Sequence, residues 1–98
     1  MKRRVVITSM GIISSLGRNH VEIVKSFKER KVNFERPPFD DEVVTSPIRN
    51  FNVRDYTGPF KDGRYLTRGS QFAVASAVAA IKDSGCKKND LAEAGLFV

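Results

Sequence analysis

The sequence predicts an α/β chain that begins with an apolar strand and a covering helix. A long irregular segment, a second helix and the start of another strand then follow. The run Val5-Val6-Ile7 has no polar alternation, which is typical of a strand in a parallel sheet that is covered on both faces. The stretch QFAVASAVAAIKDSG combines strong helix formers with a terminal glycine. Sites in open α/β sheets form at the carboxyl ends of strands, so the turn after Ile7 is the first place to look for function.

Composition points to one small soluble domain. The chain has 98 residues, of which 41% are hydrophobic and 29% are charged, so neither disorder nor a fibrous repeat is indicated. No apolar run approaches the length of a membrane span, and the short apolar run behind the basic N-terminus is too interrupted for a secretory signal. The single cysteine, Cys86, cannot form an intramolecular disulfide. We therefore expect a cytoplasmic protein.

The net charge of +6 lies near the front of the chain. Residues 1–36 hold nine Lys or Arg against three Glu, whereas residues 37–98 hold eight of each sign. A basic front is able to bind nucleic acid, an anionic membrane surface or an acidic protein. The basic residues are dispersed between apolar ones, without a cluster of stacking aromatics, so a solvated helix face is the preferred interpretation. We expect no membrane partner and no nucleic-acid partner.

The first helix has a clear start signal. Asn19 is followed three residues later by Glu22, the spacing of an N-cap with its capping-box partner. Helix is predicted from there to about Arg30. An apolar stripe for packing on the strand is formed by Ile23, Val24 and Phe27.

Residues 31–62 are predicted to form an irregular cap or excursion. They contain all four prolines and no sustained periodicity, and such a length usually marks a linker or a binding segment. Disordered linkers are poor in aromatics, yet this segment has five. Because they are able to pin an irregular path onto a surface, we expect an anchored excursion. The five aromatic residues are Phe34, Phe39, Phe51, Tyr56 and Phe60.

The second helix is predicted from Tyr65 or Leu66 to Ser84, with Gly85 as its left-handed terminator. Its five alanines leave little side-chain bulk, so neighbouring elements are able to approach it closely. A polar connection follows, with Asn89 or Asp90 as a possible cap. Residues 95–98 then begin another apolar strand.

Catalytic interpretations of this chain are weak. Cys86 and His20 are its one cysteine and one histidine, the minimum pair for thiolate chemistry. Cys86 follows a helix instead of preceding one, so no helix N-terminus supports its thiolate, and a structural role is preferred for both residues. Gly11 and Gly17 lack the spacing of a phosphate-binding loop, which favours a role in turns. We expect no catalytic residue, metal ligand or cofactor-binding residue in this chain.

Two motifs carry a resemblance to a known family. The opening RVVITSMGIISSLG is similar to V-V-I-T-G-x-G-x-x-S-P-L-G, and Gln71-Phe72-Ala73 in the second helix is similar to M-D-R-x-x-Q-x-A. Together they resemble the N-terminal portion of the β-ketoacyl-acyl-carrier-protein (ACP) synthases, condensing enzymes of fatty-acid or polyketide synthesis. The resemblance covers essentially the whole chain. Departures are Ser9 for glycine, Ser15 for proline and Thr67 where aspartate is frequent.

The resemblance implies a thiolase-like fold and a function. The parent protein would condense an acyl thioester with malonyl-ACP and release carbon dioxide, using no metal and no dissociable cofactor. Its catalytic cysteine and partner residues would lie outside this chain. In bacterial members, a basic cluster before the Gln-bearing helix helps to dock the acidic carrier protein. The matching positions here include Lys61 and Arg64, whereas Tyr65 departs from the basic residue often seen next.

Residues 1–98 are therefore expected to form an incomplete N-terminal segment of a ketosynthase domain, inactive alone. Two strands with open edges are not independently stable, so the missing edges should come from more polypeptide or from another copy in a homo-oligomer. Two alternatives remain. The first is a small binding or assembly module that acts through open strand edges and a basic front. The second is a nucleic-acid binder.

Overall fold

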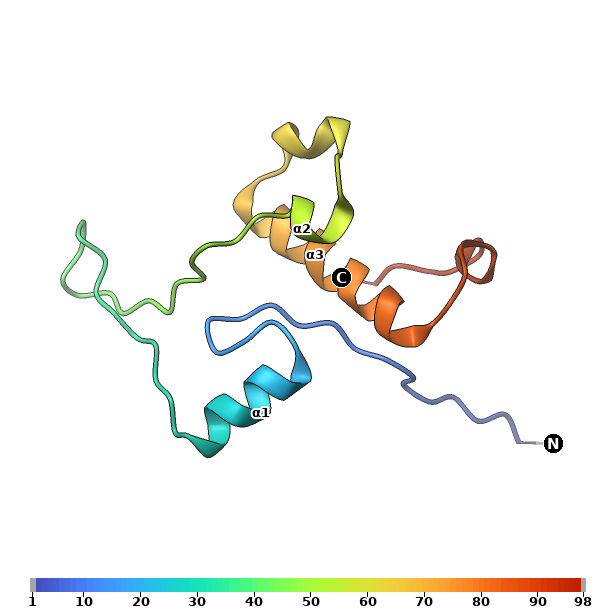
Figure 1. The fold of residues 1–98 in the computed structure, drawn as a ribbon, viewed down its shortest axis with the longest axis horizontal. Coiled ribbons are helices and arrows are strands. Elements are labelled where there is room, and N and C mark those ends of the chain that lie inside the picture. Colours follow the sequence, from blue (N-terminus) through green and yellow to red (C-terminus); the bar gives the residue numbers. More distant parts are fainter. Residues whose placement is uncertain (1, 98) are drawn as a thin grey trace.

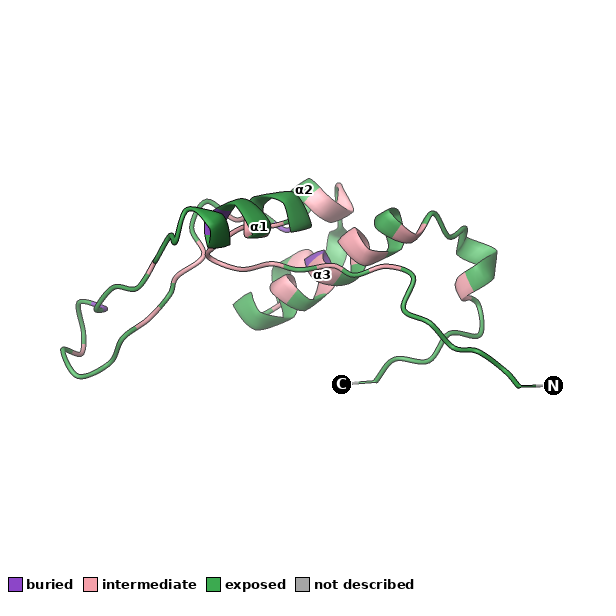
Figure 2. Ribbon diagram, turned by 90° about the horizontal axis from the view of Figure 1, so that it is seen from below, coloured by how far each residue is buried: buried purple, intermediate pink, exposed green. Residues whose placement is uncertain are grey.

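The computed structural model describes residues 2–97, which form an open helical chain (Figure 1). The helices are α1 (His20–Lys28), α2 (Arg54–Thr57), η1 (Lys61–Tyr65), α3 (Arg68–Ser84) and η2 (Lys88–Leu91), where η marks a 3-10 helix. The radius of gyration is 16.6 Å, against about 13 Å for a compact domain of 100 residues. Most of the ribbon is exposed (Figure 2). Within residues 2–97 the buried apolar side chains are Pro37, Val53 and Ala75.

The predicted strands do not form within residues 2–97. Val5 and Ile7 lie in an unpaired N-terminal segment with 95% and 89% of their surface exposed, and Phe97 is 95% exposed. Val98, the last residue of the second predicted strand, lies outside the described residues. Backbone pairing between residues 2 and 97 consists of two isolated bridges, Ser14 with Gly17 and Glu35 with Thr45. A strand needs a neighbour to accept its hydrogen bonds, and here no second strand lies beside either segment. The two predicted strands are therefore absent from residues 2–97, which show the helical part of the expected pattern.

Helix α1 begins where the sequence predicts it. Asn19 Oδ1 accepts a hydrogen bond from the backbone N–H of Glu22 at 2.9 Å. The Glu22 carboxylate accepts a hydrogen bond from the backbone N–H of Arg18 at 2.6 Å. A regular capping box would use the N–H of Asn19, one residue later. The predicted apolar packing stripe is wrong, because Val24 and Phe27 are 50% and 68% exposed. With no strand to cover, α1 instead packs through half-buried Ile23 and buried Ser26.

Helix α3 begins at Arg68, two or three residues after the predicted start at Tyr65 or Leu66. Leu66 has extended backbone angles, and Thr67 is the N-cap, whose hydroxyl accepts from Ser70 N at 3.2 Å. Its C-terminus confirms the prediction, since Gly85 adopts the left-handed conformation with φ of 70°. The next turn, η2, is closed by the Asp90 carboxylate, which accepts from Lys87 N at 2.9 Å.

The segment 31–62 is irregular over most of its length, but it contains α2, which the sequence reasoning missed. Four residues are too few for a periodic apolar pattern, so α2 had no signal of its own. It packs against α3. The aromatic side chains divide in two. Phe51 and Tyr56 are packed against each other, with ring centroids 5.9 Å apart, whereas Phe34 and Phe39 are 69% and 84% exposed and anchor nothing.

The N-terminal segment crosses α3 at Gly11. A Cβ placed on Gly11 would overlap the backbone carbonyl oxygen of Ser76 and lie 2.7 Å from the backbone nitrogen of Ala80. Contact this close to a helix backbone requires small side chains on both elements. Ala75, in the same turn of α3, is completely buried. The prediction that the alanine-rich helix permits close approach is confirmed.

Replacing Gly11 by alanine should therefore destabilise the chain. We expect Gly11→Ala to lower the free energy of unfolding by about 1–3 kcal/mol, because the clash is with backbone and the segment must move away from α3. Urea unfolding followed by circular dichroism at 222 nm measures this. The matched control is Gly69→Ala, since Gly69 lies in α3 with no atom within 4 Å of a Cβ, and alanine there should raise helix stability by about 0.5–1 kcal/mol. Equal effects of the two substitutions would contradict the close approach.

Candidate docking surface

The two cations that the resemblance singles out lie on one side of η1. Lys61 and Arg64 are three residues apart, and side chains at this spacing eclipse each other in a 3-10 helix. Hydrogen bonds from Gly63 N to Phe60 O at 3.1 Å and from Leu66 N to Gly63 O at 3.2 Å close the turn. Both cations are exposed. The turn thus presents two positive charges together, just before α3.

Neither cation forms an ion pair within residues 2–97, although the Asp62 carboxylate belongs to the same turn. The ion pairs in this range join His20 with Asp83, Lys25 with Glu29 and Arg49 with Glu35. The guanidinium of Arg64 instead contacts Tyr65. Its Cζ lies 4.8 Å from the ring centroid, and its Nη2 donates to the Tyr65 hydroxyl at 2.8 Å. The sequence reasoning treated Tyr65 only as a departure from a basic residue, and its contact with Arg64 was missed.

A second group of side chains, which we call the Phe51 cluster, joins the excursion to α3 and to the turn before α1. The ring of Phe51 lies edge-on to Phe72 of α3, with centroids 4.9 Å apart. Arg18 and Arg68 place their guanidinium carbons 5.7 and 5.4 Å from the Phe51 centroid. The members of the Phe51 cluster are Arg18, Phe51, Tyr56, Arg68 and Phe72. They join the turn before α1, the excursion and the first turn of α3.

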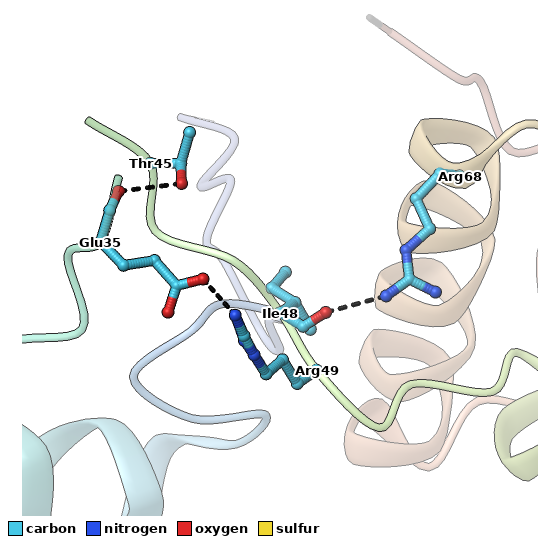
Figure 3. Close-up of polar contacts among 5 residues, drawn as sticks. All are labelled: Glu35, Thr45, Ile48, Arg49 and Arg68. Atoms are coloured by element: carbon cyan, nitrogen blue, oxygen red, sulfur yellow. Dashed lines mark hydrogen bonds and ion pairs between the residues drawn. The ribbon is translucent and has the colours of Figure 1, made fainter. Parts of the chain in front are cut away.

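Backbone carbonyls of the excursion complete the attachment. Arg68 donates to Ile48 O at 2.8 Å, and Arg18 donates to Asn50 O at 3.3 Å and to Arg49 O. Further out, Glu35 and Thr45 pair by two backbone hydrogen bonds of 2.8 Å. The side chain of Arg49 reaches back to the Glu35 carboxylate (Figure 3). Arg18, Arg49 and Arg68 therefore all make contacts within the chain.

The minimal Cys/His pair is not arranged for thiolate chemistry. Nε2 of His20 lies 3.8 Å from the Asp83 carboxylate near the end of α3, and both side chains are about half exposed. Cys86 is exposed, and its backbone N–H donates to Ser84 Oγ at 3.1 Å. No hydrogen bond joins Cys86 to His20 within residues 2–97. The preferred structural interpretation agrees with this geometry.

Two surface cavities lie away from η1. One of about 380 Å³ lies between the 14–18 turn and the excursion, and its charged lining residues are Arg18, Glu35 and Arg49, which already contact one another or the backbone. The other is an open hollow of about 560 Å³ on α1, lined on its apolar side by Val21 and Val24. In the described part of the chain no cluster of His, Cys, Asp and Glu fits a metal ion. No helix there is long and apolar enough to cross a bilayer.

Comparison with known proteins gives two sets of relatives. The chain is 35% identical over 89 residues, 85% of its length, to 3-oxoacyl-[acyl-carrier-protein] synthase 1 of Escherichia coli strain K12. It is 30% identical over 95 residues, 90% of its length, to 3-oxoacyl-[acyl-carrier-protein] synthase 2 of Staphylococcus aureus strain N315. The chain resembles a segment of the β-ketoacyl-ACP synthases. The resemblance that the two sequence motifs indicated is therefore confirmed.

The chain spans about a fifth of the length of these curated relatives. No protein-family model matches it, and no solved structure matches it. The thiolase-like fold is thus implied by the ketosynthase relatives and not by a structural neighbour. Within the ketosynthase resemblance, Thr67 has a physical role, because it replaces a frequent aspartate by another good N-cap residue.

Removing the Phe51 ring should weaken the packing of the excursion against α3. We expect Phe51→Ala to lower the free energy of unfolding by about 2–3 kcal/mol, the sum of two exposed cation–π contacts and the contact with Phe72. Urea unfolding monitored by circular dichroism measures the change. Phe39→Ala is the matched control, since Phe39 lies in the same excursion and is 84% exposed. It should change stability by less than about 0.5 kcal/mol, and a Phe51→Ala effect of the same size would refute the anchoring role.

Proposed function

We propose that the whole protein is a cytoplasmic β-ketoacyl-ACP synthase that condenses an acyl thioester with malonyl-ACP in fatty-acid or polyketide synthesis. This segment supplies part of its scaffold and part of the surface that docks the carrier protein. The observation that supports this most directly is the similarity over 85–90% of the chain to two acyl-carrier-protein synthases. The exposed pair of cations on η1 gives the docking role its residues.

The scaffold role is supported by the amount of apolar surface left uncovered. Val5, Ile7, Leu96 and Phe97 are each more than four-fifths exposed. Single exposed apolar residues are common in soluble proteins, but two whole apolar segments left this exposed indicate a surface that another element covers. We propose that residues 1–98 form an incomplete segment of a ketosynthase domain of thiolase-like fold, in which 31–62 is a cap and further polypeptide covers these apolar residues.

The chain itself is proposed to be inactive in condensation. His20 contacts Asp83, and no hydrogen bond within residues 2–97 joins it to Cys86, which lies exposed on the connection after α3. Thiolate chemistry requires a nucleophile and a base within hydrogen-bond reach.

An assay of the purified chain with acyl-ACP and malonyl-ACP tests this role. We expect no carbon dioxide release above a protein-free blank, while the protein encoded by any longer reading frame that contains the chain should release it. Condensation by the chain alone would overturn the scaffold proposal, and an inactive longer protein would overturn the synthase assignment.

The docking role follows from charge and position. A carrier protein rich in carboxylates is attracted by exposed cations, and such charges at the rim of an interface raise the association rate more than they slow dissociation. Lys61 and Arg64 share one side of a short turn and form no ion pair within residues 2–97. Arg68, four residues further on, is already bound to Ile48 O and to the aromatic rings of the Phe51 cluster. We therefore assign docking to Lys61 and Arg64 and not to Arg68.

Reversing both charges should weaken carrier binding. We expect Lys61→Glu/Arg64→Glu to reduce the affinity for acyl carrier protein by about tenfold or more, mainly through a slower association rate. Surface plasmon resonance at 50 and 200 mM salt measures both, and the difference from wild type should shrink at high salt because screening weakens exposed charges.

The matched control for this reversal is Lys2→Glu/Arg3→Glu. It changes the net charge equally, on the exposed N-terminal segment that lies away from η1 (Figure 1). If the two double variants bind the carrier equally well, general charge and not the η1 surface governs the encounter.

A second candidate is an assembly module that pairs with another copy of itself. The apolar side of α1 favours it, because Val21, Val24 and Phe27 are 78%, 50% and 68% exposed. Sedimentation velocity of the purified chain distinguishes the two candidates. A stable homo-oligomer that forms without carrier protein supports the assembly module, whereas a well-folded monomer argues against it.

A further inference from the structure

We propose that Tyr65 is a positioning residue of the docking surface. It holds the Arg64 guanidinium in one orientation, so that its remaining N–H groups are presented to a carboxylate of the carrier protein. This inference rests on the proposed docking function and adds the mechanism by which one of its two cations is oriented.

Arg64 and Tyr65 make two different contacts with each other. Arg64 Nη2 donates to the Tyr65 hydroxyl at 2.8 Å, and Arg64 Cζ lies 4.8 Å from the centre of the Tyr65 ring. A hydrogen bond and a cation–π contact from one partner restrict the guanidinium more than either alone. Tyr65 is itself 70% exposed, so the oriented pair lies at the surface where a partner protein is able to reach it.

The orientation leaves most of the guanidinium available. Arginine has five N–H donors in a planar fork, and the Tyr65 hydroxyl takes one of them. Within residues 2–97 no carboxylate pairs with Arg64. A planar carboxylate is the group that accepts two parallel N–H bonds from such a fork. The carrier group that fits is therefore an Asp or Glu side chain, bound in bidentate fashion.

The neighbouring cations lack this combination. Arg68 likewise uses one N–H, which donates to Ile48 O, but it lies over two rings, 5.4 Å from the Phe51 centroid and 4.9 Å from the Phe72 centroid, which hold it within the Phe51 cluster. Lys61 has no aromatic contact in the described chain, and its ammonium is a point charge on a flexible stem. On this surface Arg64 is thus both oriented by Tyr65 and available to bind a carboxylate. Lys61 attracts the carrier without fixing its orientation.

Orienting the Arg64 guanidinium before binding should raise the affinity for the carrier protein. Immobilising a flexible side chain on binding costs an amount equivalent to about two- to tenfold in the dissociation constant. If Tyr65 has already paid that cost in the free protein, its loss should weaken binding by that factor. The loss should matter only when residue 64 is an arginine.

The experiment is a double-mutant cycle on the full 98-residue chain, with purified acyl carrier protein as the probe in surface plasmon resonance. Tyr65→Leu should weaken binding by about two- to tenfold, and Tyr65→Phe, which keeps the ring, should weaken it less. In an Arg64→Lys background, Tyr65→Leu should have no further effect, because lysine has no fork to orient. Tyr56→Phe is the matched control, since Tyr56 packs on Phe51 and lies outside η1.

Four outcomes decide the proposal. Non-additive loss in the cycle supports it. Equal loss from Tyr65→Leu with arginine or lysine at position 64 overturns it, because Tyr65 then acts independently of the fork. No loss from Tyr65→Leu, while Lys61→Glu/Arg64→Glu still weakens binding, overturns the positioning role and leaves docking intact. No loss from that charge reversal overturns both.

A readout without the carrier tests the orientation directly. Arg64 Cζ lies 4.8 Å from the Tyr65 ring centroid. The NMR resonances of the Arg64 side chain should therefore carry a ring-current shift that Tyr65→Leu removes and Tyr65→Phe largely retains. Random-coil shifts for Arg64 in the wild-type chain would overturn the proposal even if Tyr65→Leu weakened carrier binding.

Discussion

The position of Phe51 between two arginines is the contact on which the rest of the described chain depends. Its ring packs edge-on against Phe72, and Arg18 and Arg68 lie over it. These residues come from the turn before α1, from the excursion and from α3. The buried apolar side chains in residues 2–97 are Pro37, Val53 and Ala75. Removing the ring would therefore weaken the packing of three segments that are otherwise joined by hydrogen bonds from Arg18 and Arg68 and by the contact of α2 with α3.

The same contact explains why the basic residues of this chain differ in role. Seventeen Lys and Arg are distributed along the sequence, but position decides what each one does. Arg18 and Arg68 satisfy backbone carbonyls of an irregular segment that has almost no ladder hydrogen bonds of its own. Lys61 and Arg64 lie on a turn that is already closed by backbone bonds, so their charges face outward. A count of charges in the sequence does not separate these two groups.

Local signals in the sequence predicted the helices well and the strands badly. The N-cap Asn19 and the terminator Gly85 act through neighbours within four residues, so the ends they mark are present in the structure. A strand depends on a partner that is distant in sequence, and Val5 to Ile7 find none within residues 2–97. The same limit applies to the candidate site. Lys61 and Arg64 were identified from a resemblance, whereas the contacts of Phe51 with Arg18 and Phe72 join residues too far apart for any periodicity to reveal.

The arginines that secure the excursion recognise its main chain and not its side chains. Every residue, proline included, offers the carbonyl oxygen that Arg18 or Arg68 requires at Ile48, Arg49 and Asn50. Ile48 is therefore free to drift in identity over evolutionary time without loss of the attachment, so long as the Arg68 guanidinium persists. Arg49 and Asn50 are less free, because the Arg49 side chain also pairs with Glu35 and Asn50 has a left-handed φ of 54°. Sequence divergence at Ile48 would therefore be a poor guide to structural divergence.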